Sequence, residues 1–297
     1  MRSGKKKSQS IWEQSFHRLM KNKLAIVSII FLIFMFIFSF IGPLFSPYIS
    51  DNVNASIIKQ PPSLEHLLGT DDYGRDVLTR LMLAGRISLT VGIASMVLSL
   101  ILGTLLGAIS GYYGGIIDTI IMRLADILMS IPGLPLLIII GALLSELRVP
   151  AEYRLYIVML MLSLVGWPSL ARLVRGQILY LREQTYMKAV DILGLSDRRK
   201  ILHHLIPNIF PLLIVVATLS TASGILSESS LSFLGLGVIP PTPSWGNMIS
   251  AANNLMDFQS RAWLWVPPGV AIFLTVVAIN LLGEAIRDVL DPKMKGR

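Results

Sequence analysis

The chain has 297 residues, 53% of them hydrophobic and 15% charged, with a mean hydropathy of +0.66. Soluble domains carry about 25% charged residues, so this composition excludes an ordinary soluble domain and indicates a membrane protein. The net charge of +8 sits between apolar segments, which favours basic cytoplasmic loops over nucleic-acid binding, and the absence of cysteine excludes disulfides, thiolate metal sites and cysteine catalysis.

Six apolar segments approach the length of about 20 residues that a membrane-spanning helix needs. We therefore expect an all-α, polytopic membrane protein with six transmembrane helices, the fourth of them short and interrupted by Pro168. The predicted spans are residues 24–45, 87–111, 119–144, 155–171, 209–230 and 263–283. The predicted division is an N-terminal cytoplasmic segment with the first helix (1–60), an extracytoplasmic linker (61–86), a five-helix core (87–284) containing a cytoplasmic loop (177–208), and a cytoplasmic tail (285–297).

Lysine and arginine are unevenly distributed over the connections between these spans. Residues 1–23 hold seven, residues 172–207 hold seven and residues 284–297 hold four. The alternate connections are poorer, with four, two and one. Because cytoplasmic loops carry the excess of Lys and Arg, both termini and the 172–207 loop are predicted to be cytoplasmic.

An acidic group precedes the second span, on the extracytoplasmic side. Asp71, Asp72 and Asp76 lie within six residues of one another and beside Arg75. They could form a cation site. With Arg80 and Arg86 nearby, a salt-bridged structural elbow is the favoured interpretation.

Small residues recur along spans two and five. In span two they stand at every fourth position and so share one helix face. This ridge could pack helices of one subunit together, or form a seam near a translocation path or a partner subunit. Span five could face water or another helix. The candidates for a translocation path are Ser95, Ser99, Gly103, Ser220, Ser223 and Gly224.

Charged residues are rare within the predicted spans. Asp118, Arg123 and Asp126 cluster at the start of span three and Glu228 closes span five, so local pairing at the membrane interface is expected. No acid or histidine is obvious near the midplane, which disfavours a proton-coupled secondary carrier. Arg172 and Arg175 share a helix face, where a lipid phosphate or a carboxylate would anchor them.

The cytoplasmic loop before span five is polar and prone to form helices. Residues 185–193 favour a helix, and Gly194 suits the left-handed stop that ends one. Ser196 can cap a second helix that runs to Leu205, and Asn208 can cap span five. The loop is thus two short helices joined by a bend. It could dock a partner, or lie on its own subunit or on lipid headgroups.

A Pro-rich segment follows span five. It is predicted to form a rigid extracytoplasmic turn with a tryptophan in the interface belt. Its residues are Pro240, Pro241, Pro243, Trp245 and Gly246.

The chain lacks the motifs of an energy-coupling or catalytic site. It has no Gly-x-x-x-x-Gly-Lys-Ser/Thr loop, no His-Glu-x-x-His and no Gly-x-Ser-x-Gly. His203 and His204 are adjacent, so on a helix they point about 100° apart and suit one metal poorly. We therefore predict that the chain is not an enzyme, binds no metal or cofactor, and takes energy for transport from elsewhere.

The loop resembles the Glu-Ala-Ala motif of ABC importer permeases. Lys188, Ala189 and Val190 occupy the Glu-Ala-Ala positions, and Gly194 and Pro207 fall at the expected spacings. Lys188 stands where the family has an acid. Five further segments, in order, resemble the C-type permeases of dipeptide and oligopeptide importers, a family that includes nickel and glutathione permeases: residues 12–48, 68–92, 166–179, 228–248 and 280–292.

The resemblance implies a type I ABC importer permease in a bacterial inner membrane. The subunit would form the path with a homologous B-type permease, receive peptides from an extracytoplasmic solute-binding protein, and be driven by two ATPase subunits that bind ATP and Mg. Nickel, metallophore or glutathione transport, a self-sufficient secondary carrier, and a receptor or scaffold remain alternatives. The implied ATPase-coupling residues are Met187, Lys188, Ala189, Val190, Asp191, Leu193, Gly194, Leu195 and Pro207.

Overall fold

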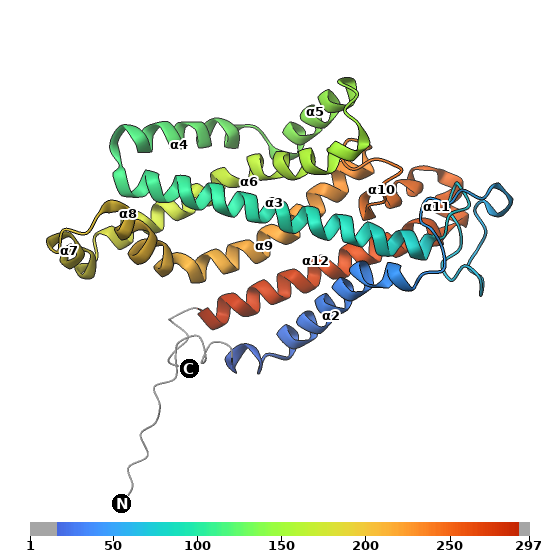
Figure 1. Cartoon of the computed structure of the whole chain (residues 1–297), viewed down its shortest axis with the longest axis horizontal. Helices are drawn as coiled ribbons and strands as arrows, with labels where there is room; N and C mark the ends of the chain where they lie inside the picture. The colour runs from blue at the N-terminus through green and yellow to red at the C-terminus, as the bar shows by residue number, and fades with distance from the viewer. Residues whose placement is uncertain (1–16, 291–297) are drawn as a thin grey trace, which may run out of the picture.

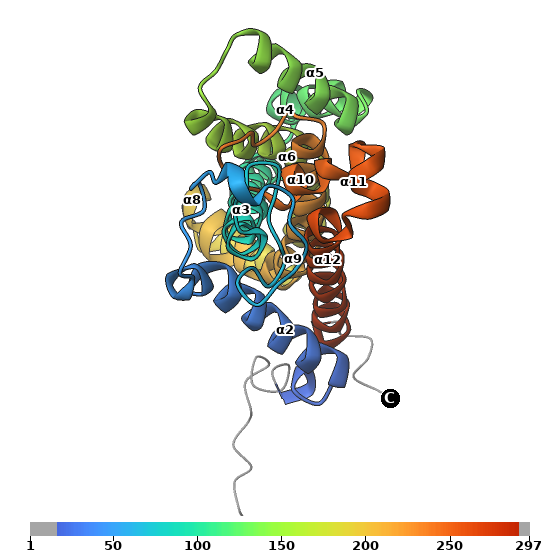
Figure 2. The same ribbon diagram turned by 90° about the vertical axis from the view of Figure 1, so that its right-hand side faces the viewer.

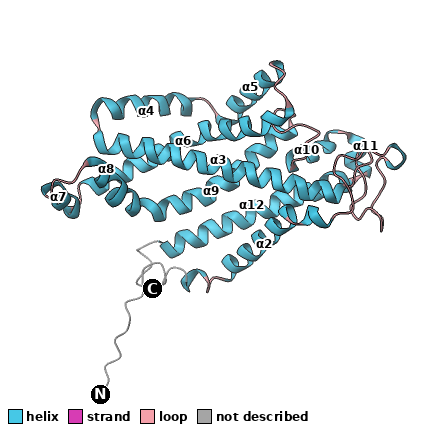
Figure 3. Cartoon of the chain, in the orientation of Figure 1, coloured by secondary structure: helices cyan, strands magenta, loops and turns pink. Residues whose placement is uncertain are grey.

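The computed structural model describes residues 17–290, and these form helices joined by loops. Figure 3 shows this helical character, and among the described residues the only strand-like pairing is an isolated bridge between Thr70 and Asp76. The α-helices are α2 (Lys23–Phe40), α3 (Val77–Tyr113), α4 (Gly115–Ser130), α5 (Gly133–Glu146), α6 (Ala151–Arg182), α7 (Thr185–Ile192), α8 (Asp197–Arg199), α9 (Ile206–Phe233), α10 (Trp245–Ile249), α11 (Leu255–Ser260) and α12 (Ala262–Leu290). Short 3₁₀ turns lie at Gly42–Phe45, Ala55–Ile57 and Ser250–Asn253, and a π-helical turn at Lys200–Leu205.

The long helices run side by side along the long axis of the molecule (Figure 1). The small helix α7 lies at one end of this bundle, and α10 and α11 lie at the other (Figure 1). We call these the α7 end and the α10 end. The N-terminus of α2 and the C-terminus of α12 both point toward the α7 end (Figure 1), and viewed along the bundle, α3 lies among α2, α6 and α9 (Figure 2).

Five described helices are long and apolar enough to cross a membrane, and α4 with α5 makes a sixth if the two count as one span. The predicted third span, 119–144, is therefore broken, with a bend of 83° between its halves. Ile131 is extended at φ −96° and ψ 127°. Proline disfavours the helical conformation in the residue before it, so Pro132 explains the break.

Two spans are longer than hydropathy alone predicted. Helix α3 begins at Val77, inside the predicted linker 61–86, because the Asp76 side chain accepts a 2.8 Å hydrogen bond from the Thr79 backbone N–H and caps the helix. Helix α6 has 32 residues and continues through Pro168, so the predicted short, interrupted fourth span is wrong.

The small-residue ridge of α3 packs against α6 over its second half. A Cβ at Gly107 would lie 2.4 Å from the Ala171 carbonyl oxygen, and one at Gly111 would lie 2.9 Å from Ile178. Gly103 is equally tight against Leu170, at 2.8 Å. Of the two interpretations of this ridge, close packing within one subunit is confirmed for these three glycines.

Two expectations for the α10 end are corrected by burial. Trp245 was expected in the interface belt, yet it is fully buried and its indole N–H donates to the Leu81 carbonyl oxygen at 3.2 Å. Glu228 was expected to pair at the interface, yet it too is fully buried, among serine hydroxyls. Parts of the basic termini, residues 1–16 and 291–297, lie outside the described residues, so the predicted tail 285–297 is described only to Leu290.

Candidate functional site

The first candidate site is α7 with the bend that follows it. Helix α7 ends at Ile192 with Leu193 as its C-cap, and Gly194, predicted to form the left-handed stop, follows with φ +67°. A Cβ there would meet nothing within 4 Å, so glycine is needed for its left-handed conformation rather than for space. Ser196 stands at the next N-cap but its side chain makes no capping hydrogen bond, and Asn208 donates to the His204 carbonyl oxygen instead of capping α9.

The two faces of α7 have different surroundings. Met187 and Val190 are buried, 1% and 8% exposed, and pack in one cluster with Ile178 of α6 and Leu205 and Ile209 at the start of α9. The opposite face is open to solvent. Its apolar tip consists of Ile192, 88% exposed, and Leu193, 76% exposed. Two adjacent and highly exposed apolar side chains thus stand at the end of a helix that is anchored on its other face.

The predicted coupling residues therefore divide into two groups. Met187 and Val190 anchor α7, and Leu195 is half-buried. Pro207 belongs to the first turn of α9, not to α7. Lys188, Ala189, Asp191, Leu193 and Gly194 are exposed. Ile192 was missed, although its place on the helix opposite Met187 and Val190 could have identified it.

A polar network ties α7 to the rest of the bundle. Lys200 Nζ lies 2.6 Å from Asp191 Oδ1 and 3.9 Å from Asp197 Oδ1. The Tyr112 hydroxyl, at the end of α3, donates to Asp197 Oδ1 at 2.6 Å, and Arg182 donates to the Tyr112 carbonyl oxygen at 2.8 Å. Asp191 is one of the implied coupling residues. The structure pairs it with Lys200 of its own chain.

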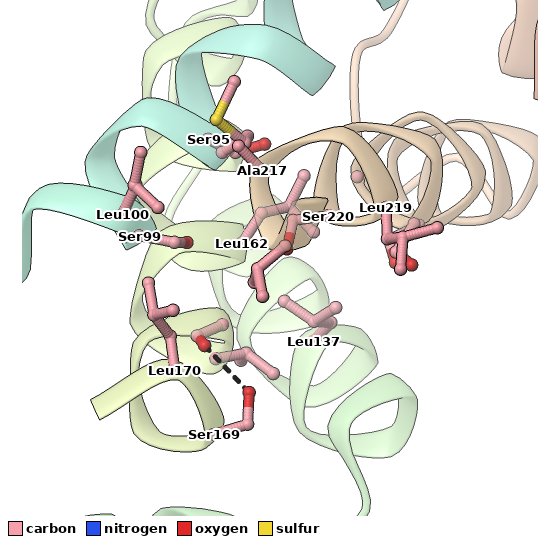
Figure 4. A pocket seen from close by; sticks show the side chains of 17 residues that line it. Ser95, Ser99, Leu100, Leu137, Leu162, Ser169, Leu170, Ala217, Leu219 and Ser220 are labelled. Atoms are coloured by element: carbon pink, nitrogen blue, oxygen red, sulfur yellow. Dashed lines mark hydrogen bonds between the residues drawn. The ribbon is translucent and has the colours of Figure 1, made fainter. Parts of the chain in front are cut away.

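The second candidate site is a cavity of about 360 Å³ between α3, α5, α6 and α9. Figure 4 shows Ser99, Ser169 and Ser220 arranged around the same space. Six serines line it among apolar side chains, and none of the lining residues is charged: Ser95, Ser99, Ser169, Ser220, Ser223 and Ser227. Serine hydroxyls both donate and accept hydrogen bonds, so this lining suits a neutral or zwitterionic solute.

Five of the six predicted path residues line this cavity: Ser95, Ser99, Ser220, Ser223 and Gly224. Gly103 does not, because it lies against Leu170 between α3 and α6. Sequence spacing had suggested the two serine faces separately. The structure places them opposite each other on α3 and α9 and adds Ser169 of α6.

Charged groups brace α4 against α6 beside the cavity. Arg175 of α6 makes two 2.5 Å hydrogen bonds to the carboxylate of Asp118, and Arg172 pairs with Asp126. A carboxylate anchor for both arginines is confirmed. The expected pairing within the Asp118, Arg123 and Asp126 cluster is wrong for the two acids, since their partners come from another helix.

The acidic group at the α10 end is structural, as predicted. Asp71 pairs with Arg75 at 2.8 Å and with Arg80 at 3.4 Å. Asp76 caps α3 and contacts His66, and Arg86 lies over the Phe40 ring instead of joining the acids. Among the described residues no three His, Asp or Glu side chains are placed to hold a metal ion.

A second ion-pair group joins the loop before α3 to α11. Lys59 Nζ lies 2.8 Å from Asp257, whose carboxylate also pairs with Arg261 at 2.5 Å. Burial alone would raise the pKa of Asp257, but the hydrogen bonds from Lys59 and Arg261 outweigh it and lower that pKa below its usual value. The same hydrogen bond, with one to Asp72, raises the pKa of Lys59.

Known proteins resemble the chain over nearly its whole length. A family model described as "Binding-protein-dependent transport system inner membrane component" matches residues 103–296, and one described as "N-terminal TM domain of oligopeptide transport permease C" matches residues 10–62. The oligopeptide transport system permease protein OppC of Bacillus subtilis is 37% identical over 98% of this chain and 92% of its own length.

Two further relatives have other printed substrates. The dipeptide transport system permease protein DppC of Alkalihalophilus pseudofirmus is 40% identical over 96% of this chain and 91% of its own length. The glutathione transport system permease protein GsiD of Escherichia coli O6:K15:H31 is 36% identical over the same shares. With its apolar helices and these matches, the chain belongs to the family of binding-protein-dependent transport system inner membrane components, as a multi-pass permease subunit of an ABC importer.

Proposed function

We propose that this subunit imports di- and oligopeptides, forming the path together with a homologous B-type permease in a bacterial cell membrane. An extracytoplasmic solute-binding protein delivers the peptide at the α10 end. Two ATPase subunits bind ATP and Mg and dock at the α7 end, which is cytoplasmic together with both termini. The charge distribution supports this orientation, since residues 172–207 hold seven of the basic side chains.

The exposed tip of α7 is the observation that carries this proposal. Ile192 and Leu193 extend from a helix whose other face is fixed in the core by Met187 and Val190. A force applied to the tip passes through that buried cluster into α6 and α9. Both helices also line the serine cavity, so a displacement of α7 changes the walls of the path.

A movement of α7 can also reach α3 through the polar contacts of Lys200. Its contacts with Asp191 of α7 and Asp197 of α8, and the Tyr112 hydrogen bond to Asp197, connect the docking helix to the end of α3. Helix α3 carries Ser95 and Ser99 of the cavity wall. ATP-driven closure of the ATPases would therefore reach three of the four helices around the cavity and shift the equilibrium between inward-open and outward-open states.

Peptide is the substrate class that the cavity favours. Its serine hydroxyls can hydrogen-bond peptide groups in turn, and its apolar walls accommodate varied side chains. The printed names of the relatives support peptides, including glutathione, as the class. A free metal cation would meet no charged group among the residues that line this cavity.

Uptake by the reconstituted complex tests the proposal. The chain is purified with its co-purifying subunits, placed in liposomes with MgATP inside and the binding protein outside, and offered labelled tripeptide, glutathione or ⁶³Ni²⁺. We expect peptide uptake that requires both ATP and the binding protein. Uptake of nickel alone, or peptide uptake by the single purified chain driven by a proton gradient without ATP, would refute it.

A further inference from the structure

Glu228 is an acidic side chain inside a predicted span that neither the docking helix nor the cavity explains. It is fully buried in α9, and no Lys, Arg or His of the described residues pairs with it. Its Oε2 accepts a hydrogen bond from Ser88 of α3 at 2.8 Å and its Oε1 one from Ser232 of α9 at 2.7 Å, and Ser229 Oγ lies 3.4 Å from Oε2. A carboxyl group in a membrane span is costly to bury, which calls for a role.

The hydrogen-bond directions around Glu228 follow from proton counting. Ser88 Oγ accepts the backbone N–H of Trp245 at 3.2 Å, and Ser232 Oγ accepts the backbone N–H of Val238 at 2.9 Å. Each hydroxyl has one proton, so each is free to donate it to Glu228. The carboxylate is thus the common acceptor of two relays that fix Val238 and Trp245 to α3 and α9. We call Glu228, Ser88 and Ser232 the clasp.

The clasp holds both ends of the segment 238–245 in place. The Trp245 end is further locked by close packing, because a Cβ at Gly246 would lie 2.4 Å from the Ser229 carbonyl oxygen. Similarly, a Cβ at Gly85 would lie 2.8 Å from the Trp245 ring. This side of the segment therefore cannot separate from α3 and α9 without breaking hydrogen bonds and repacking the core.

The preceding loop, 234–238, meets α5 through Leu236. Leu236 packs with Leu137 of α5 and Leu231 of α9, and an ideal Cβ at Gly141 would lie 2.9 Å from the Leu236 Cβ. Leu137 also lines the cavity, as does Ser227, the neighbour of Glu228. The stretch of α9 that lines the cavity ends at Ser227, and α9 itself ends at Phe233 toward α10, so the loop that follows lies on the α10 side of the cavity and contacts its wall through Leu137.

We propose that the loop 234–238 is the gate at the α10 end of the cavity, that it opens where Leu236 meets α5, and that Glu228 is the positioning residue that keeps the loop on α9. The free-energy cost of separation differs between the contact of the loop with α5 and its attachment to α3 and α9. Parting Leu236 from α5 leaves no hydrogen bond unmade, whereas releasing Val238 and Trp245 would strand two buried N–H groups and a carboxylate. The gate rests on the proposed function, since it assumes that the cavity is the path.

A disulfide tests where the gate opens. The natural chain has no cysteine, so Gly141→Cys with Leu236→Cys introduces one defined pair. Their Cβ atoms are close enough for a bond after a small shift. We expect oxidation of the double variant to reduce peptide uptake at least tenfold and reduction to restore it, while either single variant is insensitive to oxidant. A double variant that is fully crosslinked yet transports at the unoxidised rate overturns the gate.

Thiol labelling tests the clasp even if the disulfide forms poorly. In the Leu236→Cys variant, a bulky maleimide added from the binding-protein side reports how often the loop leaves α5. Glu228→Gln replaces one accepting oxygen of the clasp with an NH₂ group, which donates hydrogen bonds instead of accepting them. One serine then loses its acceptor and the loop is held less firmly, so we expect labelling to accelerate several-fold. Ser232→Ala removes one relay and should act in the same direction if Glu228→Gln assembles poorly.

The matched control is Ser230→Ala, because Ser230 is exposed and bonds only to the Leu226 carbonyl oxygen. We expect it to leave the labelling rate unchanged. Equal labelling rates in all these variants overturn the clasp. Failure of the proposed function has a different signature, since the unmodified complex would then show no ATP-dependent peptide uptake in the same liposomes.

Discussion

Replacing Ile192 by aspartate should weaken ATPase docking without destabilising the folded permease. The Ile192 side chain is 88% exposed, so the subunit loses almost no internal packing when it changes. Burying an isoleucine side chain at an interface is worth about 1.5–3 kcal/mol, and nearly all of that surface is available for docking. Losing this contribution weakens ATPase binding about 10- to 150-fold, and desolvation of the new carboxylate adds to the loss.

The measurement is the Kd of purified ATPase subunits for the permease pair in nanodiscs, with the Tm of the pair measured alongside. Leu64→Asp is the matched control, because Leu64 is 98% exposed in the loop before α3, at the α10 end. Met187→Ala provides the opposite contrast, since Met187 is 1% exposed and its truncation leaves a cavity costing about 2–5 kcal/mol of permease stability. If Ile192→Asp binds the ATPases as tightly as the natural chain, α7 does not dock through its apolar tip.

Three further predictions concern packing and charge. Asp257→Asn should lower the free energy of unfolding at pH 7 by on the order of 2–4 kcal/mol, and the Tm with it, because Lys59 then keeps only the half-exposed Asp72 as a partner. Since the folded pKa of Asp257 is lowered from 3.8, this stabilisation is complete above about pH 4 and is lost as the pH falls through the folded pKa, so the Tm advantage over Asp257→Asn must shrink in acid; a constant difference would contradict the assignment. Gly107→Val should reduce the yield of folded subunit, judged by size-exclusion chromatography, because its Cβ would clash with the α6 backbone, and a monodisperse variant of unchanged Tm would contradict this packing. Lys200→Asp should lower peptide uptake while ATP hydrolysis continues, and Asp191→Lys in the same chain should restore part of the uptake through the reversed pair; no restoration would remove this ion pair from the transmission route.

Local patterns predicted the broad architecture of this subunit well. Apolar length and loop charge predicted a helical protein with six spans, which matches the structure when α4 and α5 are counted as one span. Glycine conformation predicted the bend at Gly194. The family motifs identified the transport system, and the comparisons confirm it. Such features depend on residues close together in sequence, so a single sequence is enough to predict them.

Local sequence patterns gave wrong helix boundaries where the environment of a residue depends on contacts with distant parts of the chain. Hydropathy stopped the fourth span at residue 171, before Arg172 and Arg175, yet helix α6 continues to Arg182, and Arg175 pairs with Asp118 of α4. Pro168 does not end that helix, whereas Pro132 breaks the predicted third span. Pro132 follows an extended residue, Ile131, at the end of α4, whereas Pro168 lies inside a continuous helix, and the local sequence does not distinguish the two cases.

By itself, the sequence determined an all-helical, multi-pass membrane protein with a basic, helix-forming loop before α9, because hydropathy, charge asymmetry and turn residues act locally, and its family motifs identified it as a permease. Only the tertiary structure decided which face of α7 is free, that the serines of α3 and α9 share one cavity, and that Glu228 is the centre of a clasp. Glu228 and Ser88 are 140 residues apart, and the local sequence around either residue does not indicate that they are in contact. A buried carboxylate is tolerated only where the fold supplies donors, and those donors come together only when the helices pack.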